Sequence, residues 1–403
     1  MLMLDHRKLG RELELFATDP MAGAGLPMWL PDGAAARHAV EEYLREEERR
    51  AGYQHVNSPP LGKKEMYLTS GHLPHYADDM FPVMALSSSP DDEFVLRPSA
   101  CPHHALIYRS RGRSYRELPL RIAELGGMYR SERSGVLGGL SRVRGMWLND
   151  AHIFVALEQV ADEIAAVLRL IDAAHAKLGV KPAGLRLSLR GDGPKYVGDA
   201  AMWDRAEQIL RDVLAGSGRA FVEVPGEAAF YGPKIDIQVE DAGGREMTLS
   251  TIQVDFHQPA RFDLEYVDSA GERQRPVMIH RSLVGSMERL FAYLIEVHDG
   301  AFPFWYAPRQ LQVLPISSGQ DGAAADFAKA AVRAGLRAEV VHEGSVSARV
   351  RRSAQQRVPY VAIIGPAEAS SGQVSLRPRN APGLAPMPSG EVLRRLVSEA
   401  DPH

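Results

Sequence analysis

The chain contains a single cysteine, Cys101, in the stretch SACPHH. A lone cysteine is most often a small buried hydrophobic residue. Two histidines occur in strand-like stretches further along, His152 in MWLNDAHIF and His280 in VMIHRSL, and either one alone is more often a core residue than a ligand. Together the thiol and the two imidazoles would supply three zinc ligands with an open fourth position, which is typical of a catalytic or substrate-binding zinc. Because the three residues are far apart in the sequence, both interpretations stay open.

Arginines form a second group that could do chemistry. Arg130 and Glu132 are two residues apart in YRSERSG, so on a strand they would point to the same face. Arg142 and Arg144 repeat this spacing after a glycine-rich turn. A hairpin with two such pairs offers a donor-rich surface for a phosphate-like anion. A solvated edge hairpin with salt bridges explains the same spacing equally well.

The stretch IHRSLVGSMERLFAYLIE contains another arginine in an unusual place. Ser286 is the expected N-cap of an amphipathic helix. Arg289 then falls in the first turn, where the helix dipole disfavours a cation by about 0.3–1 kcal/mol at an exposed site. A bound anion would offset this cost, so we favour ligand binding at Arg289 over surface decoration.

The elements that must position these residues change in character near residue 306. Before it, helical periodicity covers 157–179 and 200–218, and strand-like runs separated by turn signals fill 220–282. This pattern predicts an α+β domain with an antiparallel sheet. After it, apolar strands alternate with helices, which predicts a small, mainly parallel α/β domain. The predicted domains are 1–306 and 307–403.

The composition restricts the class of protein. The net charge of −4 argues against non-specific coating of nucleic acid, although a local basic face can still contact RNA. One cysteine excludes an internal disulfide framework. No apolar run has the length of a membrane span, and the N-terminus lacks a signal-peptide core. We therefore predict a cytoplasmic protein with no membrane partner.

Several stretches closely resemble motifs of threonyl-tRNA synthetase, a class II aminoacyl-tRNA synthetase: GMYRSERSG, GGLSRVRG, NDAHIF, AFYGPKIDIQV and VMIHRSLVGSMERL. The resemblance runs from DHRKLGRELELF to RVPYVAIIG and includes SGHLPHY and the motif 1 proline, Pro59. It implies the class II antiparallel sheet flanked by helices, an anticodon-binding-type α/β domain after it, and a homodimer formed through motif 1. The implied reaction is ATP-dependent activation of threonine to threonyl-adenylate and its transfer to tRNA, with tRNA-Thr the expected acceptor.

The same resemblance assigns roles to residues. It implies one Zn²⁺ per chain on Cys101, His152 and His280, binding the amine and β-hydroxyl of threonine, and Mg²⁺ with ATP. Arg130 would hold the substrate carboxylate and the α-phosphate, and His72 would lie near the terminal ribose of tRNA. The implied catalytic residues are Arg130, Arg289, His72 and Lys234; the amino-acid site is Asp150, Tyr231, Ser286, Leu148 and Leu249; the ATP site is Arg130, Glu132, Arg142, Met146, Gln253 and Arg289.

The sequence departs from the family pattern in three respects. We expect the chain to lack the N-terminal domains, including the editing domain. Since one methyl group supports only about 10–200-fold discrimination, we expect detectable mischarging with serine unless another protein edits in trans. Pocket positions also differ, with Met146 for a common phenylalanine and Leu148 and Leu249 for other usual residues. A specialised or inhibitor-resistant copy would show such changes, and so would neutral drift. The basic helix within VHEGSVSARVRRSAQQ replaces the usual stretch near the anticodon contacts.

Two other functions fit the residues. A ligase for a different β-hydroxy amino acid in a biosynthetic pathway would need the same three metal ligands. A non-catalytic RNA-binding regulatory paralogue would fit the anticodon-binding-type domain. Retention of Arg130, Arg289 and all three candidate ligands argues against the regulator, because decay of an unused site would be expected to remove some of them.

Overall fold

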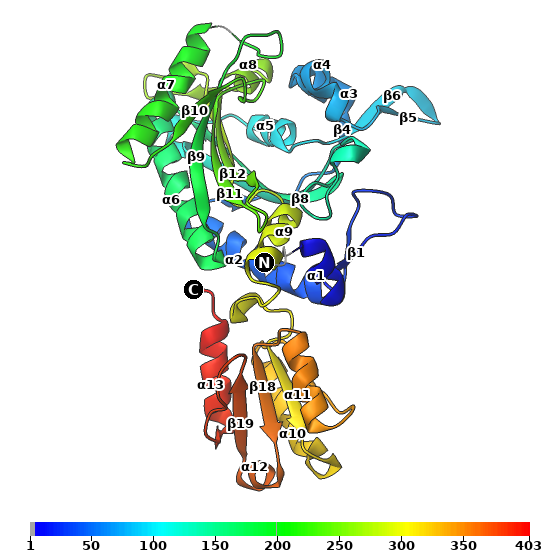
Figure 1. Ribbon diagram of the computed structural model, residues 1–403. Coiled ribbons are helices and arrows are strands. Elements are labelled where there is room, and N and C mark those ends of the chain that lie inside the picture. The colour runs from blue at the N-terminus through cyan, green and yellow to red at the C-terminus, as the bar shows by residue number, and fades with distance from the viewer. Residues whose placement is uncertain (1–4, 199) are drawn as a thin grey trace. The chain divides into compact units, whose positions relative to one another are not determined.

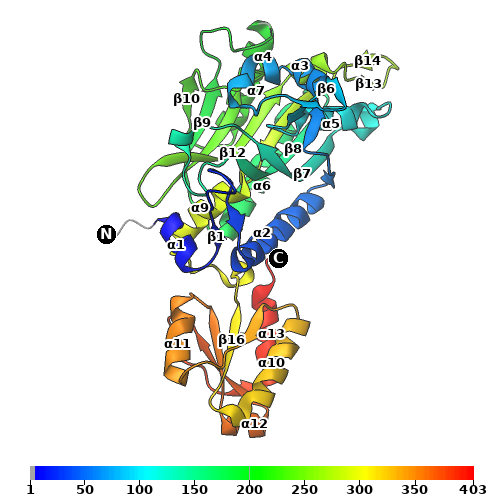
Figure 2. The same ribbon diagram turned by 90° about the vertical axis from the view of Figure 1, so that its right-hand side faces the viewer.

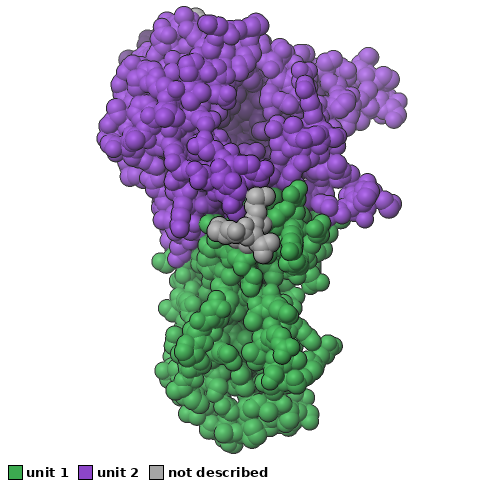
Figure 3. All heavy atoms as spheres, in the orientation of Figure 1, with its two compact units in different colours: residues 1–17, 28–43, 294–403 green, residues 18–27, 44–293 purple. Residues whose placement is uncertain are grey.

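The computed structural model describes residues 5–198 and 200–403, which form two units (Figures 1 and 3). The first four residues of the predicted N-terminal domain and Asp199 lie outside the described residues. Residues up to 17, residues 28–43 and residues 294–403 make unit 1, and residues 18–27 and 44–293 make unit 2. Helices α2 (Pro31–Arg50) and α9 (Met287–Val297) contain two of the points where the chain passes from one unit to the other.

Unit 2 is built on one eight-stranded sheet with the order β10-β9-β11-β12-β15-β8-β7-β3. The pairs β10–β9 and β3–β7 are parallel and the other five are antiparallel, which confirms the antiparallel sheet predicted from the sequence. The strands are β3 (Gln54–His55), β7 (Leu120–Tyr129), β8 (Gly145–Val155), β9 (Pro182–Leu189), β10 (Val222–Pro225), β11 (Lys234–Glu240), β12 (Glu246–Asp255) and β15 (Val277–Ser282).

Helices cover both faces of this sheet (Figure 1). On one face, α6 (Val160–Leu178) contacts β12 and β15, and α7 (Ala200–Gly216) contacts β9. The buried residues of α6 recur at helical spacing and give it an apolar stripe toward the sheet. Helix α6 ends at Gly179, whose left-handed conformation (φ 75°) is favourable for glycine at a helix C-terminus. The opposite face carries α5 (Cys101–Arg109) and is the face on which the candidate site lies.

Smaller elements complete unit 2. A three-stranded sheet has the order β4-β6-β5, and a two-stranded ribbon pairs β13 with β14. These strands and the remaining short helices of the unit are β4 (Leu61–Lys63), α3 (Lys64–Thr69), α4 (His72–Tyr76), β5 (Met84–Leu86), β6 (Ser89–Leu96), α8 (His257–Arg261), β13 (Tyr266–Val267) and β14 (Arg273–Gln274).

Unit 1 contains a five-stranded sheet with the order β17-β16-β18-β19-β20. Strands β17, β16 and β18 are parallel, and β19 and β20 are antiparallel, so the predicted α/β architecture is confirmed. Figure 2 shows α11 on one side of this sheet and α10 and α13 on the other. The elements are β16 (Leu311–Pro315), α10 (Asp321–Arg333), β17 (Ala338–Val340), α11 (Val346–Gln355), β18 (Tyr360–Ile364), α12 (Pro366–Ser371), β19 (Gln373–Pro378), β20 (Met387–Pro388) and α13 (Ser389–Ala400).

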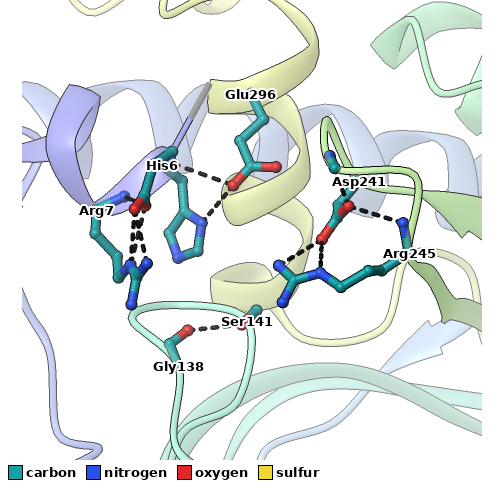
Figure 4. Close-up of polar contacts among 9 residues, drawn as sticks. His6, Arg7, Gly138, Ser141, Asp241, Arg245 and Glu296 are labelled. Carbon is teal, nitrogen blue, oxygen red and sulfur yellow. Dashed lines mark hydrogen bonds and ion pairs between the residues drawn. The ribbon is translucent and has the colours of Figure 1, made fainter. Parts of the chain in front are cut away.

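The N-terminal elements of unit 1 are α1 (His6–Glu12), β1 (Phe16–Ala17) and β2 (Met28–Trp29). Helix α1 is tied to the end of α9, because both the backbone N–H and Nδ1 of His6 contact Glu296 Oε1, at 3.1 and 2.7 Å (Figure 4). Among the helices of the described residues, none combines the length and the apolar content that crossing a membrane requires.

Candidate active site

A pocket of about 320 Å³ lies on the α5 face of the main sheet, entirely within unit 2. Figure 3 shows that the surface of this unit is hollowed. All of the predicted site residues line the pocket except His72, Glu132 and Arg142, although they come from segments up to about half the chain apart. The lining residues that the sequence predicted are Cys101, Arg130, Met146, Leu148, Asp150, His152, Tyr231, Lys234, Leu249, Gln253, His280, Ser286 and Arg289.

The register of the sheet explains why these residues meet. Lys234 of β11 is paired with Gln253 of β12, Gln253 with His280 of β15, and His280 with His152 of β8. Directly paired residues share one face of a sheet, so four neighbouring strands present this row to the pocket. Side chains two residues apart on a strand also share a face, which adds Asp150 on β8.

Cys101, His152 and His280 form a compact buried group. One potential ligand atom from each residue lies within 4.8 Å of the others, and His152 Nε2 is 2.9 Å from His280 Nδ1. Cys101 is the first residue of α5, so the start of this helix brings its Sγ to the two histidines. The structure thus joins the three residues that the sequence suggested as zinc ligands.

The surroundings of this group favour a thiolate beside a positive charge. Burial alone would raise the pKa of the Cys101 thiol, but the charge of His72 and hydrogen bonds with His152, His280 and His72 lower that pKa well below its ordinary value. Burial lowers the pKa of His280, whereas its hydrogen bonds with Asp255 and Cys101 raise it, and the resulting pKa is about 10. A thiolate between two imidazoles is a suitable ligand set for a borderline-soft cation.

Arginines occupy another part of the pocket. Arg289 donates from Nε to Ser141 O (3.2 Å) and from Nη1 to Thr248 O (3.1 Å), and both of these acceptors are neutral carbonyl groups. Arg130 donates from Nε to Pro98 O at 3.3 Å. Burial lowers the pKa of Arg289, and the positive charges of Arg130 and Arg142 lower it further. An arginine remains charged under these conditions, so this part of the pocket carries positive charge that an anion can neutralise.

The helix that carries Arg289 begins as the sequence predicts. Helix α9 starts at Met287, and the Ser286 hydroxyl accepts a hydrogen bond from the backbone N–H of Arg289 at 3.1 Å. The turn before it needs a glycine, because Gly285 has a φ of 68° and a Cβ there would lie 2.6 Å from Leu249 O. This close approach places Ser286 beside the β12 wall of the pocket.

The charged residues of the predicted arginine hairpin are arranged differently from that prediction. Arg130, Glu132, Arg142 and Arg144 lie in the connection between β7 and β8 rather than on strands, so strand alternation does not set their directions. Arg142 Nη2 contacts Glu132 Oε2 at 2.8 Å, and Arg144 donates to the carbonyl of Glu132 at 2.9 Å. Glu132 and Arg142 therefore neutralise each other, and only Arg130 of this set lines the pocket.

The remaining predicted residues are held by local partners. Lys234 forms an ion pair with Asp236, which also accepts from Ser188 Oγ at 2.8 Å, so the charge of Lys234 is compensated. Tyr231 donates to the Gln253 side-chain oxygen, and its ring stacks on His280 with centroids 4.6 Å apart.

His72 lies next to Cys101 of the candidate metal group. Its Nε2 is 3.7 Å from Cys101 Sγ, and Ser99 Oγ contacts both atoms, at 2.8 and 3.1 Å. Its Nδ1 contacts Ser70 Oγ at 2.8 Å. The side chain is buried, and His72 is not among the residues that line the pocket.

Sequence reasoning missed several lining residues. Asp236, Thr251 and Ser282 each lie two positions from a predicted residue on the same strand. The alternation of side chains along a strand was the signal that would have found them. Thr248 and Arg281 also line the pocket, and no comparable spacing indicated them.

Comparisons with known proteins identify relatives of this chain. Residues 84–298 match the family model described as "tRNA synthetase class II core domain (G, H, P, S and T)", and residues 310–399 match the model described as "Anticodon binding domain". The chain is 46% identical to "Threonine--tRNA ligase 1" of Bacillus subtilis over 98% of this chain and 62% of that protein. It is 47% identical to a threonine–tRNA ligase of Listeria welshimeri over 93% of this chain and 58% of that protein. The chain thus spans about three fifths of the length of the curated relatives it matches.

A solved structure extends the agreement to the fold. The RNA-binding domain of threonyl-tRNA synthetase from Cryptosporidium parvum superposes with a TM-score of 0.93 at 34% identity, covering 98% of each chain. The family models, the curated relatives and this structural likeness confirm the resemblance seen in the sequence. The chain belongs to the threonyl-tRNA synthetase family of class II aminoacyl-tRNA synthetases.

Proposed function

We propose that the protein is a threonine–tRNA ligase, which activates threonine with ATP to threonyl-adenylate and transfers the threonyl group to tRNA, with tRNA-Thr as the acceptor. The observation that carries this proposal is one pocket that joins a thiol–imidazole group to two arginines that donate hydrogen bonds to neutral carbonyl groups. A small hydroxy amino acid and a polyphosphate need these two environments side by side.

One Zn²⁺ on Cys101, His152 and His280 is part of this proposal. The donor set of one thiolate and two imidazoles, buried and within 4.8 Å, fits a three-ligand zinc with an open position. When bound, the metal would supply a Lewis acid that holds the amine and the β-hydroxyl of the amino acid. Asp150 of β8 and Tyr231 line the same pocket and are the residues that we assign to orienting the amine.

For the activation step, Arg130 and Arg289 would hold the phosphates of ATP, and Mg²⁺ would accompany the nucleotide. A threonine carboxylate oxygen attacks the α-phosphorus, the bond from that phosphorus to the bridging oxygen breaks, and pyrophosphate leaves. The two guanidinium groups stabilise the charge that develops on the phosphate oxygens, mainly through positioning and electrostatics. Met146 and Gln253 line the pocket and remain the proposed base and nucleotide contacts.

Three assignments rest on the resemblance more than on pocket geometry. Glu132 and Arg142 are proposed as adenine and triphosphate contacts, which requires their mutual ion pair to open or to share the ligand. His72 is proposed as a group near the terminal ribose of tRNA. Lys234, already paired with Asp236, is proposed as a further active-site cation.

The proposed architecture of the protein follows the same family. Residues 1–306 would form the catalytic domain and residues 307–403 the anticodon-binding-like domain. The family-model matches over residues 84–298 and 310–399 support this division. We also propose that the protein is a homodimer that works in the cytoplasm.

The test is amino-acid-dependent ATP–pyrophosphate exchange by the purified chain with threonine, serine, valine and other β-hydroxy amino acids, before and after removal of metal. Metal-dependent exchange with threonine, together with threonylation of tRNA-Thr, is the expected result. The apolar side chains of Leu148 and Leu249 in the pocket favour one alternative, a ligase for a different β-hydroxy amino acid. Exchange only with such an amino acid would establish that alternative, and no exchange from the folded, zinc-loaded chain would favour a regulatory paralogue.

A further inference from the structure

A buried chain of hydrogen bonds runs outward from His152, away from the pocket. His152 Nδ1 lies 2.8 Å from His104 Nδ1, and His104 Nε2 lies 3.1 Å from Glu124 Oε2. The side chains of His152, His104 and Glu124 are all buried, with exposed fractions of 1%, 0% and 2%. His104 follows Cys101 by three residues on α5 and does not line the pocket.

Glu124 ends this chain as an ionised carboxylate. Its Oε1 accepts from Arg97 Nη2 at 2.9 Å, and its Oε2 accepts from Ser58 Oγ at 2.6 Å. Burial raises the pKa of Glu124, but the hydrogen bonds from His104, Ser58 and Arg97 outweigh burial and lower it to about 2. An ionised carboxylate can only accept hydrogen bonds, so His104 must donate to it from Nε2.

The hydrogen-bond geometry then determines the direction of the next contact. His104 uses Nε2 to donate to Glu124, and an imidazole that donates from one ring nitrogen accepts at the other. The lone pair of His104 therefore lies on Nδ1, which faces His152. His152 must therefore carry its proton on Nδ1 and donate it across the 2.8 Å contact, which leaves its Nε2 unprotonated.

A carboxylate also orients the second histidine, His280, in this case by direct contact. His280 Nε2 lies 2.9 Å from Asp255 Oδ2, which also accepts from Gln258 Nε2 at 3.0 Å. A carboxylate behind the ring directs the proton to His280 Nε2 and turns Nδ1 toward His152. The inner nitrogens of the two rings are 2.9 Å apart, so their lone pairs would repel each other unless a cation or a proton lies between them.

We propose that His104 is a positioning residue that holds His152 in its Nδ1-protonated tautomer, with Glu124 behind it, and so keeps His152 Nε2 free to bind the metal. This inference rests on the proposed metal site, to which it adds His104 as a positioning residue. Outer hydrogen-bond partners of metal-binding histidines typically contribute 10–100-fold to metal affinity.

Two substitutions at His104 separate its two contacts. In His104→Gln, the amide group reaches the position of Nε2 and can still donate to Glu124, but nothing accepts the proton of His152 Nδ1. In His104→Asn, the amide oxygen lies near the position of Nδ1 and can still accept that proton, while the contact with Glu124 is lost. His103→Gln is the matched control, because His103 is the neighbouring buried residue of α5 and its Nε2 contacts the backbone oxygen of Leu61, at 3.4 Å, outside this hydrogen-bond chain.

The readout is the Zn²⁺ dissociation constant of the full chain, measured by competition with a chromophoric chelator. Circular dichroism and thermal unfolding of the metal-free variants test whether each is folded, and the Co²⁺-substituted spectra report the ligand geometry. We expect His104→Gln to weaken Zn²⁺ binding about 10–100-fold and to alter the Co²⁺ spectrum. We expect a smaller loss for His104→Asn and a wild-type value for His103→Gln.

The outcomes distinguish this inference from the proposed function. A folded His104→Gln with wild-type Zn²⁺ affinity and an unchanged Co²⁺ spectrum would overturn the positioning role and leave the metal site intact. A wild-type chain that binds no Zn²⁺ would overturn both. If His104→Gln does not fold, His104→Asn decides, and wild-type affinity and Co²⁺ spectrum in that variant would overturn the role of Glu124 in orienting the ring.

Discussion

The two parts of the pocket satisfy their polar groups in opposite ways. Beside the cysteine, His280 has a carboxylate behind it, and His152 has a carboxylate at the end of a relay through a second ring. Beside α9, Arg289 and Arg130 donate hydrogen bonds to neutral carbonyl groups.

This difference shows what each part is built to bind. The histidine part has its outer donors and acceptors paired, and its inner nitrogens face each other, so a cation completes it. The arginine part has its side chains oriented by the backbone but keeps its positive charge, so an anion completes it. Arg142 and Lys234 lie nearby but are neutralised by Glu132 and Asp236, which concentrates the free positive charge on the other two arginines.

The largest expected effect comes from removing the thiolate. Cys101→Ser keeps the size of the side chain but replaces a zinc ligand with a hydroxyl group, so bound zinc should be lost. Because a metal contributes several kcal/mol to substrate polarisation, we expect threonine-dependent pyrophosphate exchange to fall roughly 10³-fold or more. Chelator-treated wild-type protein is the control and should show a similar loss. An active, zinc-free variant would contradict the assignment of this part of the pocket to a cation.

The arginine part is tested by Arg289→Ala. Loss of this positive charge should reduce kcat/KM for ATP by about 10²–10³-fold, because it removes a preorganised donor to the phosphates, and zinc content should stay unchanged. Arg245→Ala is a control on the exposed β11–β12 hairpin, where Arg245 pairs with Asp241 (Figure 4). Equal effects of the two substitutions would remove the contrast between the two parts of the pocket.

A buried histidine, His175, supports the turn that leads to α9, and we expect its contribution to stability to depend on pH. His175 of α6 contacts Ser250 Oγ at 2.7 Å and Leu283 O at 3.2 Å, and Leu283 lies in the turn before Ser286. Burial lowers the pKa of His175 to about 4. The unfolded chain takes up this proton first, so the neutral ring's contribution to stability is complete above about pH 6.5 and is lost progressively as the pH falls to about 4.

The loss assigned to His175 is at most about 3 kcal/mol, from a pKa difference of roughly 2.5 units. His175→Gln retains a donor at the position of Nε2 and should flatten the dependence of the urea unfolding midpoint on pH in this range. His342→Gln, at an exposed histidine of unit 1, is the control. An unchanged pH profile for His175→Gln would exclude this residue as a source of acid sensitivity.

The smallest expected effect concerns which amino acid the histidine part of the pocket selects. Serine offers the same amine and hydroxyl as threonine and lacks one methyl group, so its activation should be only about 10–200-fold weaker. Valine lacks the hydroxyl and should be activated far more weakly than serine. Exchange kinetics with the three amino acids test this order, and activation of valine above serine would contradict selection by a metal-bound hydroxyl.

The sequence predicted the local features of this site well. Ser286 was expected as an N-cap from its place before an amphipathic stretch, and the structure places its hydroxyl on the Arg289 amide. The antiparallel sheet and the following α/β region were also predicted, because side-chain periodicity and turn residues are local signals. Strand alternation failed at Arg142 and Glu132, since these residues lie beyond the strand ends in the β7–β8 connection.

By itself, the sequence determined the family through its motifs, the type of most elements through their periodicity, and the candidate chemistry through residue types. Only the tertiary structure decided that Gln253, His280 and His152 lie side by side on three neighbouring strands, because register depends on pairing between distant segments. The same holds for His104, whose role follows from the two groups that its ring nitrogens contact. A proton's place on a buried ring is set by neighbours that only folding brings together.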